Sequence, residues 1–87
     1  MEFNKELLKN DVGVHCDTEE KANQLLEWAN LNNRKWIDGT SFVFSNEFGK
    51  YKKNTVYFIA SGTISSIHKC KKAKDSVITF DAAKESK

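Results

Sequence analysis

The chain has 87 residues, 39% of them hydrophobic and 30% charged, a balance typical of a globular rather than a disordered protein. A chain of this length forms a single α+β domain, residues 1–87, and buries only about 60 to 65% of its unfolded surface, which excludes a deep cleft built by one copy. Its net charge of +2 is well below that of a typical nucleic-acid-binding domain.

The N-terminal part predicts a short arm, a strand and then a helix. The arm, residues 1–10, has only a weak helical pattern, whereas Val12–Cys16 alternates with period two. Asp17 followed by Glu20 fits a helix-capping box. The helix ends near three asparagines, which tolerate a left-handed C-cap. Its predicted apolar face consists of Ala22, Leu25, Leu26, Trp28 and Ala29, and its terminal asparagines are Asn30, Asn32 and Asn33.

The middle of the chain predicts a small hairpin followed by a lysine-rich loop. Two short strands, Lys35–Ile37 and Ser41–Ser45, flank the turn signal Asp38–Gly39. Alternation along the second strand places Phe42 and Phe44 on one side. Residues 46–54 are polar apart from two aromatic rings, and we expect a loop.

The C-terminal half predicts three strands. Thr55–Ala60 is β-branched and aromatic, and it turns at Ser61–Gly62 into a strand over Thr63–His68. A basic loop over Lys69–Asp75 leads to a strand over Ser76–Phe80. The last residues, 82–87, are expected to form a frayed tail.

These elements predict an α+β fold with one main amphipathic helix packed on a four- to five-stranded, mainly antiparallel sheet. One helix covers one face, so the other is expected to expose Tyr57, Ile59 and His15. An exposed apolar face indicates an oligomer or a partner.

Enzyme signatures are missing, and we expect no catalytic residue, no metal and no cofactor. The sequence has no Gly-rich phosphate loop, no nucleophile elbow and no paired metal-ligand spacing. Cys16 and Cys70 lie far apart in the sequence, and only His68 and Cys70 would share a strand face as a catalytic pair.

No apolar run of about 18 residues and no signal peptide occur, so we expect a cytoplasmic protein without a membrane partner.

Two runs interleave aromatic rings with cations and hydroxyl or amide groups, as sites for phosphorylated ligands do. A ring stacks on a base, and a cation holds a phosphate. Trp36 is either a core or a stacking residue, and Tyr51, in a charged loop, is the better candidate for an exposed ring. The candidate ligand-binding residues are Arg34, Lys35, Trp36, Thr40, Ser41, Lys50, Tyr51, Lys52, Lys53, Asn54 and Thr55.

Roughly residues 12–60 resemble a group of small phage and prophage proteins of Gram-positive bacteria. The similar motifs are Val14–Cys16, Asp17–Ala22, Leu25–Trp28, Arg34–Trp36 with Asp38–Gly39, and Asn54–Tyr57. The group tends to place Gly in the turn before its Lys-Trp pair, where this chain has Asn32 and Asn33. Some proteins that look like these act as sponges for the cyclic nucleotide signals of CBASS or Thoeris defences.

The resemblance implies an immune-evasion sponge in the cytoplasm of an infected bacterium. A site for a cyclic nucleotide or similar phosphorylated ligand would require a homo-oligomer, because one chain cannot build the walls. The alternative is a small phage inhibitor that binds a host protein through its exposed sheet face. A nucleic-acid-binding accessory using the run Lys69–Lys74, and an enzyme, rank lower.

Overall fold

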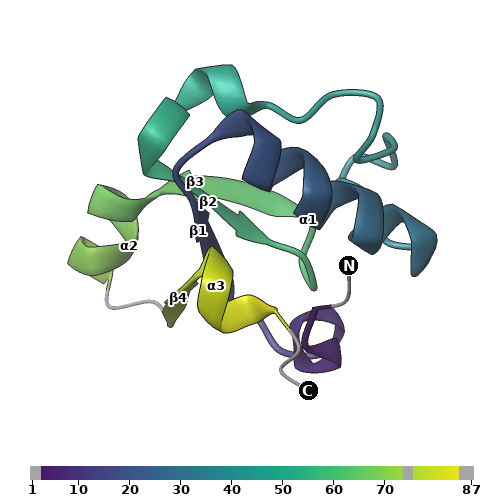
Figure 1. The fold of residues 1–87 in the computed structure, drawn as a ribbon, viewed down its shortest axis with the longest axis horizontal. Coiled ribbons are helices and arrows are strands. Elements are labelled where there is room, and N and C mark those ends of the chain that lie inside the picture. Colours follow the sequence, from purple (N-terminus) through teal and green to yellow (C-terminus); the bar gives the residue numbers. More distant parts are fainter. Residues whose placement is uncertain (1–2, 74–75, 85–87) are drawn as a thin grey trace.

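The computed structural model describes residues 3–73 and 76–84, and its strands form one four-stranded mixed sheet in the order β3-β2-β1-β4 (Figure 1). The longest helix, α1, crosses one face of this sheet. In chain order the elements are η1 (Lys5–Leu8), β1 (Gly13–Cys16), α1 (Glu19–Leu31), η2 (Phe48–Lys50), η3 (Lys52–Asn54), β2 (Thr55–Phe58), β3 (Thr63–Ser66), α2 (Ile67–Ala73), β4 (Val77–Thr79) and α3 (Phe80–Ala83).

The predicted α+β class is confirmed, and the sheet has the smaller of the two predicted strand numbers. β1 pairs with β2 and β2 with β3 in antiparallel orientation, whereas β1 and β4 are parallel. β3 and β4 therefore point the same way at opposite edges of the sheet. Parallel strands need a crossover connection, usually a helix, and α2 provides it.

The predicted strand over Thr63–His68 is confirmed only as far as Ser66. The predicted basic loop over Lys69–Asp75 is wrong as far as Ala73, and residues 74–75 lie outside the described residues. The strand ends at Ser66, and the chain continues as α2. The Ser66 hydroxyl accepts a hydrogen bond from the Lys69 amide at 3.2 Å, as a helix N-cap does. This serine, with Ile67 and Cys70 three residues apart, was the signal for a helix that the lysines obscured.

The helix α1 confirms the strongest periodic pattern of the sequence, but its cap differs by one residue. Thr18, not Asp17, is the N-cap, and its hydroxyl accepts from the Lys21 amide at 3.2 Å. Asp17 instead forms a 2.8 Å ion pair with the Lys21 ammonium. At the other end Asn33 adopts a left-handed φ of 65°, as the asparagine cluster predicted.

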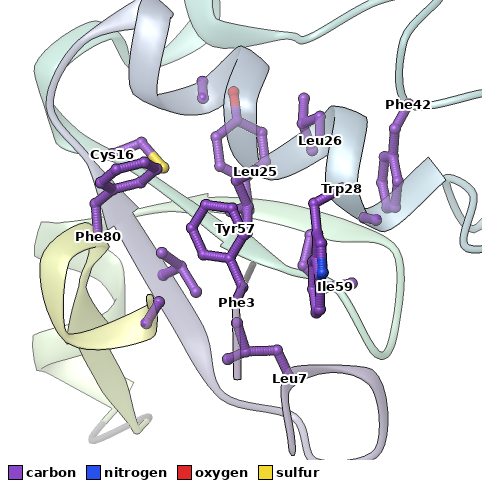
Figure 2. Close-up of a cluster of buried hydrophobic side chains, with 14 of the residues drawn as sticks. Phe3, Leu7, Cys16, Leu25, Leu26, Trp28, Phe42, Tyr57, Ile59 and Phe80 are labelled. Atoms are coloured by element: carbon purple, nitrogen blue, oxygen red, sulfur yellow. The ribbon is translucent and has the colours of Figure 1, made fainter. Parts of the chain in front are cut away.

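The main core lies between α1 and the sheet (Figure 2). Val14 and Tyr57 are register partners on β1 and β2, and both are fully buried in the cluster to which α1 contributes. The expectation that Tyr57 and Ile59 lie on an uncovered face is wrong, since both are buried in this core. From α1 the core receives Ala22, Leu25, Leu26, Trp28 and Ala29, which is the predicted apolar face.

The opposite face of the sheet is also partly covered, by α2. Val56, Phe58 and Cys70 form a second buried cluster, against which Ile67 and Val77 pack. His15, the register partner of Val56, does lie on this face and is half-buried. The crossover that makes the sheet mixed thus covers part of the face that the sequence predicted to be open.

The two ends of the described chain meet. Phe3 forms an isolated bridge with Lys84, and the ring of Phe3 packs on those of Trp28 and Phe80 at 5.4 and 5.3 Å. Ala83, expected in a frayed tail, is buried at the end of α3. Ala82 lies in α3 as well, and Lys84 forms the bridge to Phe3, so the frayed-tail prediction is wrong as far as Lys84. Residues 85–87 lie outside the described residues.

Candidate functional site

A long connection joins α1 to η2 (Figure 1). It forms one wall of a surface groove of about 520 Å³. The other wall is formed by Gly62 and by the start of β3, at Thr63 and Ile64. We call this hollow the Trp36 groove, because Trp36 is the largest of the buried side chains that line it. Its volume is within the range of sites that accept a small molecule or one anchor side chain.

Trp36 is held in place as part of the core. Its indole N–H donates to the Ser45 carbonyl at 2.9 Å, and its ring meets Phe42 edge-on at 4.7 Å. This contact geometry is favourable for two aromatic rings. Of the two alternatives that the sequence left open, the structure therefore places Trp36 in the core, with an edge at the groove.

The connection is joined to β3 through the next residue. The Ile37 amide donates to the Gly62 carbonyl at 2.9 Å. A Cβ on Gly62 would lie 2.5 Å from the Lys35 carbonyl oxygen, and Gly62 also has a φ of +71°. Glycine is needed here both for the backbone conformation and for this close approach.

The predicted hairpin is reduced to one bridge, between Lys35 and Ser41. The expectation that Phe42 and Phe44 share a side is wrong, because the segment turns rather than alternates. Phe42 is buried, whereas Phe44 is 81% exposed. Ile37, before the turn, is 77% exposed. Phe44 and Ile37 both line the Trp36 groove, and we call this pair the apolar rim.

Hydrogen bonds hold the segment that carries Phe44. The side-chain amide of Asn46 donates to Glu19 at 2.9 Å and to Asn23 at 2.8 Å, which ties the segment to α1. The Tyr57 hydroxyl, from within the core, donates to the Asn46 carbonyl at 2.6 Å. Burial raises the pKa of that hydroxyl, so it remains a donor.

A second hollow of about 480 Å³ lies between this segment and α1. Phe44 and Ser45 line both hollows, and we call the segment Val43–Ser45 the ridge between them. Val43, also on this ridge, is 55% exposed. Exposed apolar side chains are thus concentrated on a segment that hydrogen bonds attach to α1 and to the core.

Three charged groups line the Trp36 groove, and two of them are acidic. Asp38 and Glu47 are carboxylates, and the Lys50 ammonium lies 3.9 Å from Glu47. The Thr40 amide donates to the Asp38 carboxylate at 2.9 Å. Hydrogen bonds from the side chain and amide of Thr40 hold the pKa of Asp38 below its usual value, so the carboxylate is charged at neutral pH.

Of the predicted ligand-binding residues, the groove brings together Trp36, Thr40 and Lys50. Three others are bound within the protein. The Arg34 guanidinium donates to the Leu8 carbonyl at 2.7 Å, and the Ser41 hydroxyl to Asn30 at 3.2 Å. Thr55 is fully buried, and its hydroxyl donates to the Lys52 carbonyl at 2.7 Å.

The remaining predicted residues lie outside the groove lining. Lys35 is exposed at the bridge, and residues 51–54 form the turn that leads into β2. Tyr51 is half-buried there, whereas Lys52 and Lys53 are exposed. The Lys53 carbonyl accepts from the His15 ring at 2.7 Å. The sequence analysis did not predict the apolar rim, Glu47, Gly62 or the β3 residues as part of the site. The apolar residues in a stretch otherwise rich in Ser and Asn were a signal for the rim.

Reactive groups elsewhere are buried or scattered. Burial raises the pKa of the Cys16 thiol to about 12, which makes it a poor nucleophile. Cys70 lies in the cluster on the opposite sheet face, and His68 lies on α2 rather than on a strand, so the predicted strand pair does not form. Within residues 3–73 and 76–84, no three His, Cys, Asp or Glu side chains gather as metal ligands.

Over the same described ranges, none of the helices is both long and apolar enough to cross a membrane. Comparison with known proteins gives no further lead. The chain matches no family model, no curated protein and no solved structure. The function is therefore inferred from the groove itself.

Proposed function

We propose that the protein binds another protein, without catalysing a reaction, and that the apolar rim of the Trp36 groove is the contact. The single observation that carries this proposal is the exposure of Ile37 and Phe44, at 77% and 81%, beside a hollow of about 520 Å³. In the setting that the phage resemblance implies, the partner is a host protein.

The energetics favour a protein contact. Burying one exposed Phe or Ile side chain contributes about 1.5 to 3 kcal/mol, so the rim alone supplies a sizeable part of a micromolar affinity. Binding sites concentrate their energy in a few such anchors next to a pocket. An apolar side chain of the partner would fill the groove, and the exposed Phe44 ring would pack against the partner's surface.

The segment is also preorganised. Asn46 ties it to α1, the Tyr57 hydroxyl holds it from the core, and the Trp36 indole fixes the Ser45 carbonyl. A contact surface that is ordered before binding loses little conformational entropy when the partner arrives. The sheet face that was predicted to be open is partly covered by α2, so the proposed surface is this ridge instead.

A displayed random-peptide library panned against the immobilised protein tests the proposal. We expect enriched peptides that bind the wild type and lose at least about tenfold in affinity for the variant Ile37→Ser/Phe44→Ser. The matched control is Leu31→Ser, because Leu31 is also 81% exposed but lies at the end of α1. Peptides that bind all three proteins equally, or no enrichment at all, would contradict it.

We propose the cyclic nucleotide sponge as the second candidate function. The observation that favours it is that Lys50, Thr40 and Ser45 lie in one groove of small-molecule size beside an indole edge. Two carboxylates in the same lining disfavour phosphates, and the deeper walls would have to come from a second copy.

A thermal-shift panel of cyclic nucleotides, with light scattering for the oligomeric state, separates the two candidates. A sponge is stabilised by its ligand, by about 2.7 kcal/mol at a hundredfold excess over the dissociation constant. The sponge also requires an oligomer. An unchanged melting temperature with every nucleotide removes this candidate and leaves the peptide result untouched.

A further inference from the structure

The charges beside the apolar rim are unevenly balanced. Lys50 and Glu47 form a pair at 3.9 Å, which leaves Asp38 as the second carboxylate of the lining. Among the described residues, no cation forms an ion pair with Asp38. The Trp36 groove therefore combines apolar rim residues with one uncompensated negative charge.

That negative charge is held in a fixed position. The Gly39 amide donates to the Trp36 carbonyl at 2.8 Å and closes the turn on which Asp38 lies. The Thr40 amide donates to the Asp38 carboxylate from the far side of the turn. Asp38 follows Ile37 directly in the chain, so the carboxylate is adjacent to the rim.

We infer that the groove selects a partner segment in which an apolar anchor side chain is followed or preceded by a Lys or Arg. This inference rests on the proposed function. The anchor would cover Ile37 and Phe44, and the cation would meet Asp38. Complementary charge at the edge of an apolar contact contributes orientation and specificity more than affinity.

The charge of the whole chain sharpens this selectivity. Lys and Arg number 14 against 12 Asp and Glu, so the molecule as a whole does not attract a basic segment. A basic partner is favoured only where carboxylates dominate, as they do in the groove. An acidic or phosphorylated segment would be attracted elsewhere on the surface but opposed at Asp38.

The peptides enriched on the wild type provide the test. We expect a Lys or Arg next to an aliphatic or aromatic residue, and about fivefold weaker binding to Asp38→Asn. Asparagine keeps the oxygen that accepts from the Thr40 amide, so the turn is preserved. Glu20→Gln is the matched control for net charge, since Glu20 is an exposed carboxylate on α1, outside the groove.

Replacing the peptide's basic residue by Gln completes a double-mutant cycle. We expect this replacement to weaken binding to the wild type by about fivefold and to have no further effect on Asp38→Asn. Peptides that depend on Phe44 but carry no basic residue, or that bind Asp38→Asn unchanged, overturn this inference alone. Absence of any Phe44-dependent peptide overturns the proposed function together with it.

A second copy is the other occupant that the test identifies. Self-association that is lost in Asp38→Asn, measured by light scattering, would identify the partner as a second copy of this chain. Self-association that Asp38→Asn leaves unchanged would contradict the role of Asp38.

Discussion

The layer between α1 and the sheet and the segment around the Trp36 groove use apolar residues in opposite ways. On α1, five apolar side chains are buried against the sheet, and Leu31 alone among its large ones is exposed. Around the groove, Trp36 and Phe42 are buried, but Ile37, Val43 and Phe44 are exposed. The first region is held by packing, and the second by two aromatic anchors and a few hydrogen bonds.

This difference separates stability from function. Apolar surface that is already buried contributes to folding, whereas apolar surface that remains in water contributes only when a partner covers it. The segment can expose its apolar rim because Asn46, Tyr57 and Gly62 hold it without using those side chains. Changes in the two regions should therefore have different consequences.

The largest effect is expected in the α1 layer. Leu25→Ala leaves a cavity in the core and should lower the free energy of unfolding by about 2 to 5 kcal/mol. Urea denaturation measures this change. Leu31→Ala on the same helix should change it by no more than about 0.5 kcal/mol. Equal losses for the two leucines would mean that burial does not determine how much an apolar side chain contributes to the free energy of unfolding.

The junction between the segment and β3 should be nearly as sensitive. Gly62→Ala combines a left-handed φ of +71° with a clash against backbone atoms, and should cost about 2 to 4 kcal/mol. The control is Gly39→Ala, since Gly39 has a φ of +90° but nothing within 4 Å of the added Cβ. The thermal unfolding midpoint should fall further for Gly62→Ala, and similar falls would exclude the close approach.

The clamp on the Phe44 segment should give an intermediate effect. Tyr57→Phe leaves the Asn46 carbonyl without its core donor and should cost about 1 to 2 kcal/mol. Amide hydrogen exchange around residues 42–48 should accelerate more than in β1. Tyr51→Phe serves as control, and uniform acceleration through the whole protein would argue against a local clamp.

A pH effect of about 1 kcal/mol is expected from the core. The folded state raises the pKa of Cys16 from 9.0 to about 12, so the unfolded chain releases this proton first. The resulting stabilisation is complete below pH 9 and is lost as the pH rises toward 12, with about 1 kcal/mol gone by pH 10. Unfolding at pH 8 and 10 should show a smaller decline for Cys16→Ala, and an equal decline would contradict the raised pKa.

The sequence predicted those elements whose pattern is local. The period of α1 and the alternation of β1 required only neighbouring residues, as did the left-handed asparagine after α1. The α2 helix was missed because its lysines resemble a solvated loop, and its amphipathic signal spans only Ile67 and Cys70. Without α2, the covered sheet face was read as open.

The candidate site was harder to predict, because it depends on contacts between distant segments. Trp36, Thr40 and Lys50 were predicted as site residues, but the opposite wall comes from Gly62 and Ile64. The direction of Phe44 is set by the anchoring of Phe42 and Trp36, which no local period describes. Arg34 and Thr55 were assigned to ligands although the fold itself uses them.

The double variant Ile37→Ser/Phe44→Ser tests the separation of folding from binding most directly. We expect its free energy of unfolding to stay within about 0.5 kcal/mol of the wild type, while affinity for the peptides enriched on the wild type falls at least about tenfold. A loss of stability comparable to that of Leu25→Ala, with peptide binding unchanged, would contradict it.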